Sequence, residues 1–303
     1  KYIMFSILKA LFSLLILYFL YKFNILDFSL IDINNYSVLV LFTIFILIFS
    51  TIFLTSLRLY FVLRFFEFKL SLYYIFSITY IGYFFNQCLP GAQGGDLFKA
   101  VYLIKKYPKI NKLKLISYLI IDRAIGLFSL IIIFSISIYS LNIFFKDLIQ
   151  LGFILFLISI LLLCSLIILI KIRRIKIFIY KILSIIFLKK LTFFFENIID
   201  FLKRKNLSIK NISLLILISL LTFIISVISI ILLDNNETLS LSKIIKIYFI
   251  SSVTFFSNSI PISFNGLGIG EYIFSKLSNY LFSGNITYYA NLFLIYRGNN
   301  ENN

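Results

Sequence analysis

Histidine is absent from this 303-residue chain, and cysteine occurs only twice. The absence of histidine excludes nucleophiles activated by imidazole, zinc sites of the His-Glu-x-x-His type and proton relays through histidine. Cys88 and Cys164 lie far apart in apolar sequence and form no disulfide or metal-binding pattern. The sequence therefore predicts no metal and no cofactor.

Charged residues are scarce as well. They make up 14% of the chain, whereas 61% of the residues are hydrophobic and the mean hydropathy is +1.04. An ordinary soluble domain is about 25% charged. Several apolar runs reach the ~20 residues that cross a bilayer. This composition predicts an all-α, polytopic integral membrane protein built as a helical bundle.

The charged residues that remain are mostly basic. Lysine and arginine number 29 against 12 acidic residues, a net charge of +17, and they cluster between the hydrophobic runs. Cytoplasmic loops of membrane proteins show this bias. We therefore expect contact with membrane lipids and not with nucleic acid, and we place the chain in a prokaryotic cytoplasmic membrane.

The hydrophobic runs lie at about residues 7–22, 37–57, 72–89, 115–141, 148–170, 209–233 and 244–260, with a short one at 286–296. If 72–89 crossed the membrane, the basic loop after 37–57, which contains Arg58 and Arg64, would face away from the basic loop at 105–114. The charge rule favours one side for both loops. We therefore predict a re-entrant hairpin over 72–104 that turns at 90–95.

A second Pro- and Gly-broken stretch, 261–271, predicts another re-entrant hairpin over 244–282 in the opposite orientation. The bundle would then have about six spanning helices plus two inverted hairpins, as in transporters with inverted repeats. We expect one membrane domain, with a first half (1–170) and a second half (209–303). Cytoplasmic interfacial helices at 171–208, rich in both apolar and basic residues, would join the halves.

The first hairpin contains candidate ligand-binding residues. Gly94 and Gly95 permit a tight reversal, and Asp96 stands where the returning helix begins. The N-terminus of that helix would face the membrane centre and attract an anion, with Lys99 one turn along on the same face. A purely structural capping role for Asp96 stays open.

Asp122 and Arg123 interrupt the run 115–141. Each charge at the centre of a spanning helix costs about 2.5–3.5 kcal/mol, so such residues usually face a cavity or a partner. Neighbours in sequence point about 100° apart on a helix, so we expect at least one of the two to pair elsewhere. Snorkelling to the interface is the alternative.

In the second hairpin, glycines and polar residues precede Glu271, and Arg297 is the remaining deep cation. The glycine spacing is not that of a dinucleotide-binding loop. The substrate-binding residues predicted from both hairpins and the adjoining helices are Gly94, Gly95, Asp96, Lys99, Arg123, Ser263, Gly266, Gly268, Glu271 and Arg297.

Four motifs resemble the membrane region of lysylphosphatidylglycerol synthases: LPxxxGGDxxKA at 89–100, DR at 122–123, PxSxxGxGxxE at 261–271 and YR at 296–297. The resemblance covers nearly the whole chain and implies a flippase-like, lipid-handling membrane protein. It implies the stand-alone form, without the aminoacyl-transferase domain of bifunctional members. Gly126, Gly270 and Lys99 depart from the usual family residues. The family also continues with membrane helix beyond the YR motif, so we expect a truncated or divergent C-terminus.

The leading hypothesis is a protein that binds a phospholipid or polyprenyl-phosphate headgroup and moves the lipid between leaflets. Lys99, Arg123, Arg297 and the helix N-termini would hold the phosphate. One alternative is a membrane enzyme acting on a lipid-linked phosphate or sugar, with Asp96 or Glu271 as catalytic carboxylate. Another is an accessory subunit that partners a lipid-modifying enzyme or a glycosyltransferase.

Overall fold

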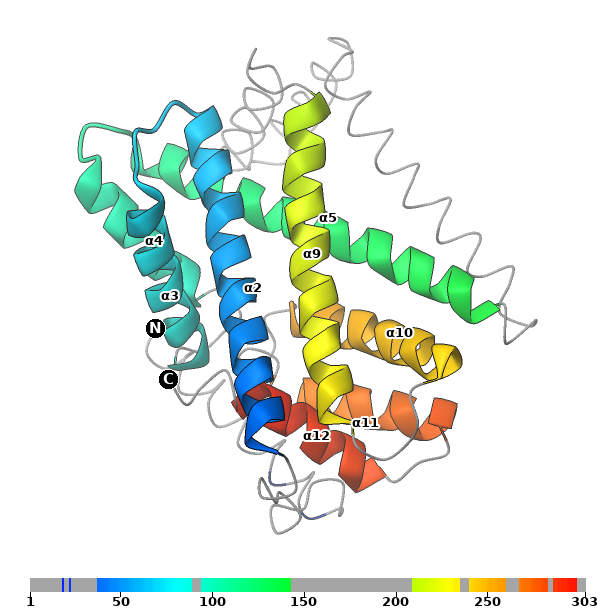
Figure 1. Cartoon of the computed structure of the whole chain (residues 1–303). Coiled ribbons are helices and arrows are strands. Elements are labelled where there is room, and N and C mark those ends of the chain that lie inside the picture. Colours follow the sequence, from blue (N-terminus) through cyan, green and yellow to red (C-terminus); the bar gives the residue numbers. More distant parts are fainter. Residues whose placement is uncertain are drawn as a thin grey trace, which may run out of the picture.

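The computed structural model describes residues 37–88, 94–142, 209–234, 240–259, 267–282 and 286–298, together with Tyr18 and Lys22. All regular secondary structure in these ranges is helical, which confirms the predicted all-α class there (Figure 1). The helices are α2 (Val38–Phe65), α3 (Leu72–Cys88), α4 (Gly94–Lys106), α5 (Lys112–Asn142), α9 (Ile209–Leu233), α10 (Leu241–Asn258), α11 (Ile269–Phe282) and α12 (Ile286–Gly298).

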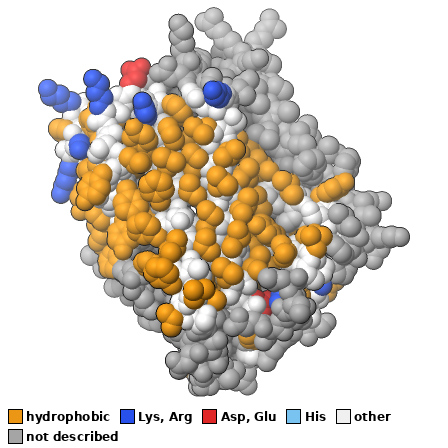
Figure 2. All heavy atoms as spheres, viewed as in Figure 1, with side chains coloured by type: hydrophobic (Ala, Val, Ile, Leu, Met, Phe, Trp, Pro, Cys, Tyr) orange, Lys and Arg blue, Asp and Glu red, His pale blue; other side chains and the backbone are white. Residues whose placement is uncertain are grey.

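Three of the described helices are long and apolar enough to cross a membrane: α2, residues Leu115–Leu141 of α5, and residues Lys210–Leu233 of α9. Helices α2 and α9 run side by side, and α5 crosses them at a steep angle (Figure 1). Large apolar side chains recur at helical spacing on the exposed face of α2, and Figure 2 shows the broad apolar surface to which they belong: Leu39, Phe42, Phe45, Ile46, Phe49 and Phe53. Together with the sequence, this surface indicates a multi-pass membrane protein.

Helix α2 is longer than the hydrophobic run that predicted it. The run was expected to end before Arg58, whereas the helix continues to Phe65 and places Arg64 in its last turn. Leu59, Val62 and Leu63 continue its buried face at helical spacing, and their packing extends the helix past the charge. The assignment of Arg58 to a cytoplasmic loop is therefore wrong.

Helices α3 and α4 form an antiparallel pair. Tyr74 near the start of α3 donates a hydrogen bond from its hydroxyl to the Tyr102 carbonyl near the end of α4, at 3.1 Å. Exposed basic residues of the two adjoining loops and helix ends gather at this end of the bundle (Figure 2): Arg64, Lys69, Lys105, Lys106 and Lys109. Both basic loops thus lie at one end, as the hairpin prediction requires. The depth of the pair in a bilayer stays a prediction.

Helices α10 and α11 form a second antiparallel pair. Ser240 caps α10, since its hydroxyl accepts a hydrogen bond from the Lys243 N–H at 3.2 Å. Lys246, in the first turns of α10, donates from Nζ to the Leu281 carbonyl at the end of α11, at 2.9 Å. Residues 261–266 of the predicted broken stretch, the run 148–170, the interfacial segment 171–208 and the run 7–22 apart from Tyr18 and Lys22 lie outside the described residues.

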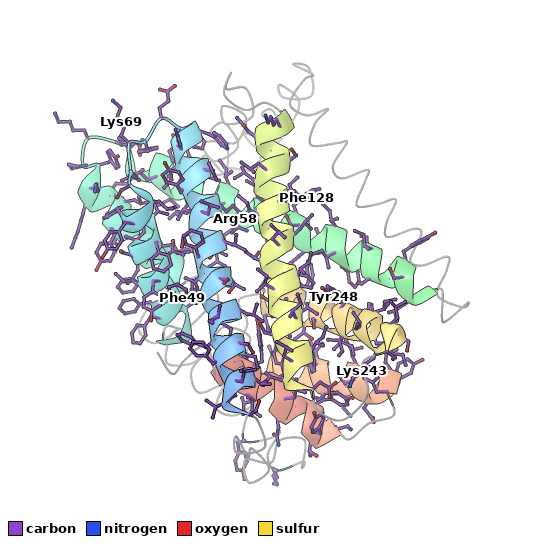
Figure 3. The ribbon with its side chains drawn as sticks, viewed as in Figure 1. Phe49, Arg58, Lys69, Phe128, Lys243 and Tyr248 are labelled. Carbon is purple, nitrogen blue, oxygen red and sulfur yellow. The ribbon has the colours of Figure 1, made fainter. Side chains whose placement is uncertain are left out.

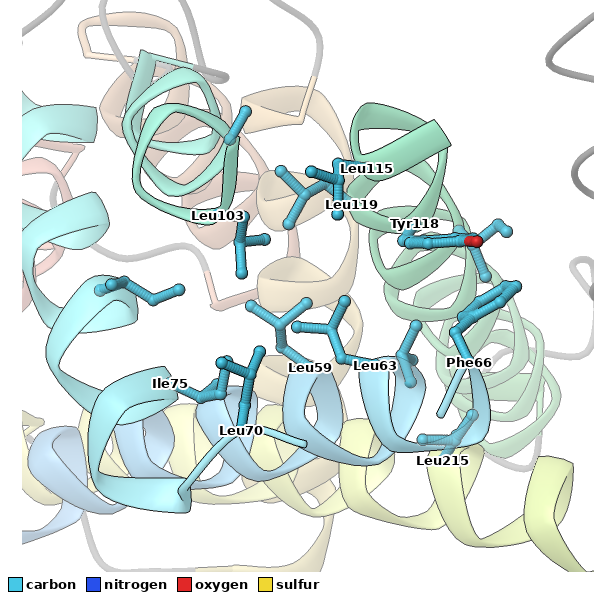
Figure 4. Close-up of a cluster of buried hydrophobic side chains, with 14 residues drawn as sticks. Leu59, Leu63, Phe66, Leu70, Ile75, Leu103, Leu115, Tyr118, Leu119 and Leu215 are labelled. Carbon is cyan, nitrogen blue, oxygen red and sulfur yellow. The ribbon is translucent and has the colours of Figure 1, made fainter. Parts of the chain in front are cut away.

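Two apolar clusters hold the helices together. One joins α2, α3, α4, α5 and α9, and Figure 4 shows its central side chains, among them Leu59, Ile75, Leu103 and Tyr118. The other joins α2, α5 and α9 to α10, α11 and α12, with Phe274 and Phe293 stacked at 4.9 Å between ring centroids. Because helices α2, α5 and α9 belong to both clusters, they fix the two antiparallel pairs around a common centre.

We expect single cysteines at positions 64 and 109, in a variant lacking Cys88 and Cys164, to react with an impermeant thiol reagent from the same side of the membrane, the cytoplasmic side. Cysteines at positions 32 and 236, which lie outside the described residues, should react from the opposite side. The physical reason is the basic bias of both short loops. Labelling of positions 64 and 109 from opposite sides would exclude the re-entrant hairpin.

Candidate functional site

A cavity lies where the helices meet. It consists of two hollows of about 320 and 290 Å³. They share much of their wall, including Arg58, Tyr83, Asn86, Gly126 and Asn258. We therefore treat them as one central cavity with two parts. Ligand sites in proteins have volumes of about 300–1,000 Å³, so each part is large enough for a small headgroup.

The charged part of the cavity is lined by Asp96 and Lys99 from α4 and by Arg123 from α5. Lys99 Nζ lies 3.2 Å from one Asp96 carboxylate oxygen, and Arg123 Nε donates a hydrogen bond to the other. One carboxylate thus serves two cations, which leaves the group with a net charge of +1. The Arg123 side chain is 31% exposed, the most of the three.

A second ion pair joins three helices. Arg58 on α2 donates to both carboxylate oxygens of Asp122 on α5, at 2.7 and 3.0 Å. Its Nη1 also donates to the Ser219 hydroxyl on α9, at 3.0 Å, and Figure 3 shows Arg58 between α2 and α9. Gly126 leaves room for the guanidinium, because a Cβ there would lie 2.7 Å from Nη1. This two-point geometry is the strongest form of arginine–carboxylate contact.

The neighbours Asp122 and Arg123 therefore have different partners, as the 100° rotation per helical residue predicts. Sequence reasoning missed Arg58. The available signal was the apolar spacing after it, Leu59, Val62 and Leu63, which continues the helix through the charge.

The third group is Glu271 with Arg297, which are bonded at 2.8 Å between Oε1 and Nη1. The other oxygen of Glu271 accepts the Gly268 N–H at 2.6 Å, and Gly268 has φ 83°, a conformation that favours glycine. Glu271 is fully buried, whereas Arg297 reaches the cavity wall. Glu271 thus caps its own helix and neutralises a cation of the cavity.

The two antiparallel pairs carry corresponding residues. In the first half, the Asn86 side chain accepts the Gly95 N–H at 2.7 Å, and Asp96 follows and pairs with an arginine 27 residues later. In the second half the order is Asn258, Gly270 and Glu271, which pairs with an arginine 26 residues later. The side chain of Asn258 packs on Gly270, since a Cβ added at Gly270 would lie 2.7 Å from the amide oxygen of Asn258. An internal structural repeat would produce this agreement.

The structure brings together four of the predicted site residues in the cavity wall: Asp96, Lys99, Arg123 and Arg297. Gly268 and Glu271 lie behind Arg297. Gly94 begins α4, and Gly95 packs against α3. Ser263 and Gly266 lie outside the described residues.

The helix N-termini have less to offer an anion than expected. The N–H of Gly95 is bonded to Asn86 and the N–H of Gly268 to Glu271. Anion binding would therefore depend on the cationic side chains. In the described part of the chain, no three His, Cys, Asp or Glu side chains come together as a metal site.

Comparison with known proteins agrees with this architecture. Neither the curated proteins nor the solved structures contain a significant match to the sequence. The family model described as the lysylphosphatidylglycerol synthase TM region matches residues 6–285, nearly the whole chain. This confirms the resemblance inferred from the motifs. The chain therefore belongs to the lysylphosphatidylglycerol synthase transmembrane family, whose members are membrane proteins linked to lipid handling.

Proposed function

We propose that the protein binds a lipid with a phosphate-containing headgroup in the central cavity and moves that lipid between the two leaflets. The observation that carries the proposal is the net positive charge of Asp96, Lys99 and Arg123 in the cavity wall. An uncompensated charge inside a membrane bundle is costly, and an anionic ligand would compensate it.

Arg123 is the main phosphate contact in this proposal. Its Nε is used by Asp96, and its terminal Nη groups have no partner within the described residues. Two parallel N–H donors on a planar guanidinium suit phosphate oxygens. Lys99, one turn from Asp96 on the same helix, would add a second positive charge.

Two further observations support a lipid mover over an enzyme. The cavity lies within a bundle whose outer faces are apolar, so a ligand with acyl chains could reach it from the bilayer. The carboxylates considered as catalytic groups, Asp96 and Glu271, are already bonded to cations. A general acid or base must lie within hydrogen-bond reach of the substrate. Glu271 is fully buried behind Arg297, and each oxygen of Asp96 contacts a cation.

Transport is tested by reconstituting the chain into vesicles that contain a fluorescent anionic phospholipid. Dithionite, added outside, bleaches only the outer leaflet. We expect bleaching to proceed beyond the outer-leaflet share in vesicles with protein and to stop there in vesicles without it. Chemically altered lipid in the same vesicles would support the enzyme instead, and bleaching that stops at the outer leaflet would contradict the proposal.

Replacing Arg123 with Gln, or Lys99 with Gln, should weaken binding of an anionic lipid about tenfold or more, because each loses a charge-assisted hydrogen bond of about 1.5–3 kcal/mol. Binding can be measured by native mass spectrometry with phosphatidylglycerol. Lys105→Gln is the matched control, since Lys105 is exposed at the basic end of α4, away from the cavity wall. Equal binding by all three variants and the unmodified chain would exclude the phosphate site.

A further inference from the structure

The other part of the cavity has a different chemistry. Its wall is lined by hydroxyl groups from α2 and α9 and by aromatic rings, and the charged side chains that the described residues contribute to it are Arg58 and Arg297. The hydroxyl-bearing residues of this wall include Thr51, Thr55, Thr222 and Ser219. We call this the hydroxyl wall. It shares Asn258 with the charged part.

The threonine hydroxyls of this wall act as acceptors, beside the donors of Arg58 and Arg297. Thr51 donates its hydroxyl hydrogen to the Ile48 carbonyl at 2.7 Å, and Thr55 donates to Ile52 at 2.8 Å. Thr222 donates to the Ser219 carbonyl at 2.7 Å. A hydroxyl whose hydrogen is used keeps lone pairs that can only accept. A ligand hydroxyl can donate to the threonine oxygens and accept from the guanidinium groups, whereas an ionised phosphate oxygen can only accept.

The ligand group that fits at the hydroxyl wall is a neutral hydrogen-bond donor. The two cations of this wall, Arg58 and Arg297, are each paired with a carboxylate, so together they add no net charge. Both oxygens of Asp122 are bonded to Arg58, and Glu271 is fully buried behind Arg297. An ammonium group would leave water without gaining a carboxylate of its own here, and burying an unpaired charge is costly. A ligand hydroxyl brings a hydrogen without a charge.

Asn258 points to the same kind of ligand. Its amide oxygen is buried and has no hydrogen-bond partner within the described residues. The corresponding oxygen of Asn86 in the first half accepts the Gly95 N–H. A buried acceptor without a partner costs free energy, and a hydroxyl at the cavity wall would supply the missing hydrogen after a small rotation of the amide.

Building on the proposed function, we propose that the preferred substrate is an anionic lipid whose phosphate carries a neutral, hydroxyl-rich group, such as inositol or a hexose. The phosphate lies at Arg123 and Lys99, and the hydroxylated ring lies at the hydroxyl wall, against the ring of Phe255. The acyl or polyprenyl part does not determine this preference.

The test compares lipids that differ in one group, by native mass spectrometry on the full chain. Phosphatidylinositol and a polyprenyl phosphohexose carry phosphate with hydroxyls, phosphatidic acid carries phosphate alone, and phosphatidylethanolamine carries an ammonium. We expect the first two to bind about tenfold more tightly than the others. Equal binding of phosphatidic acid, or tighter binding of phosphatidylethanolamine, would overturn the proposal.

A matched pair of variants locates the preference. Thr222→Val keeps the side-chain shape but removes the hydroxyl, so it should lower phosphatidylinositol binding several-fold and leave phosphatidic acid binding unchanged. Thr254→Val is the control, because Thr254 is buried in α10 away from the cavity wall and bonds only within its helix. Retained phosphatidic acid binding shows that the variant is folded. An equal loss for both lipids would overturn the role of the wall.

The headgroup preference and the proposed lipid transport can fail independently of each other. Transport of phosphatidic acid and phosphatidylinositol at equal rates would remove the headgroup preference and leave the lipid mover intact. Selective binding with no transport would remove the mover and leave the headgroup site.

Discussion

Arg58→Gln should lower the free energy of unfolding by about 3–5 kcal/mol, the usual cost of leaving a buried charge without its partner. The substitution removes both bonds to Asp122 and the bond to Ser219. The Asp122 carboxylate would then lie in the bundle with no cation opposite it. Unfolding of the detergent-solubilised protein by heat or denaturant measures the loss.

A double-mutant cycle makes this result specific. Asp122→Asn combined with Arg58→Gln leaves two neutral amides, so the double variant should be more stable than Arg58→Gln alone. Arg64→Gln is the control within the same helix, because Arg64 is exposed at its end, and it should change stability by less than 1 kcal/mol. If Arg58→Gln were as stable as the control Arg64→Gln, the pair of Arg58 with Asp122 would not hold the bundle together.

The second large effect is expected from Gly95→Ala. A Cβ at this position would lie 1.8 Å from the carbonyl oxygen of Gly82 and 2.9 Å from Asn86 Cγ. The nearest atoms belong to the backbone of α3, so α3 and α4 would have to separate. Overpacking of this kind costs about 1–3 kcal/mol, occasionally more, and we expect the upper end. It would also carry Asp96 and Lys99 away from Arg123, so anionic-lipid binding should fall with stability.

Gly82→Ala is the informative comparison, because the atom nearest its Cβ is Lys99 Cε at 2.7 Å, the end of a flexible side chain. It should cost less stability than Gly95→Ala while still weakening lipid binding, since Lys99 must move. Leu97→Ala, at an exposed position on α4, should leave both properties nearly unchanged. Wild-type stability of Gly95→Ala would mean that α3 and α4 do not meet through these glycines.

The sequence predicted the broad architecture because hydrophobic length and charge bias act locally. The run 209–233 coincides with α9, and the runs around 72–89 and 115–141 coincide closely with α3 and α5. The predicted end of α2 was wrong, because a charged residue after an apolar run indicates a loop unless its partner is known. The partner of Arg58 is Asp122, 64 residues away on another helix, and no local pattern reveals that pairing.

The candidate site was predictable to a similar degree. Deep charges and broken helices pointed to Asp96, Arg123, Glu271 and Arg297, which the structure joins in two ion pairs. The pairs themselves, the shared role of Asp96 and the hydroxyl wall could not be predicted. They depend on which faces of α2, α5 and α9 meet, and hydrophobic runs this uniform contain little information about helix rotation.

The ion pairs also constrain how the chain enters a membrane. Arg58 leaves the ribosome 64 residues before Asp122, and Asp96 leaves it 27 residues before Arg123. Until α5 is made, Arg58 on α2 lacks its carboxylate, and Asp96 on α4 has Lys99 but not Arg123 as a partner. A helix with an unpaired charge inserts into lipid at a cost of about 2.5–3.5 kcal/mol. Helices α2 to α5 therefore gain their stability together, so residues 38–142 are the smallest piece of the first half that could settle in a bilayer with Arg58 paired and Asp96 bonded to both of its cations.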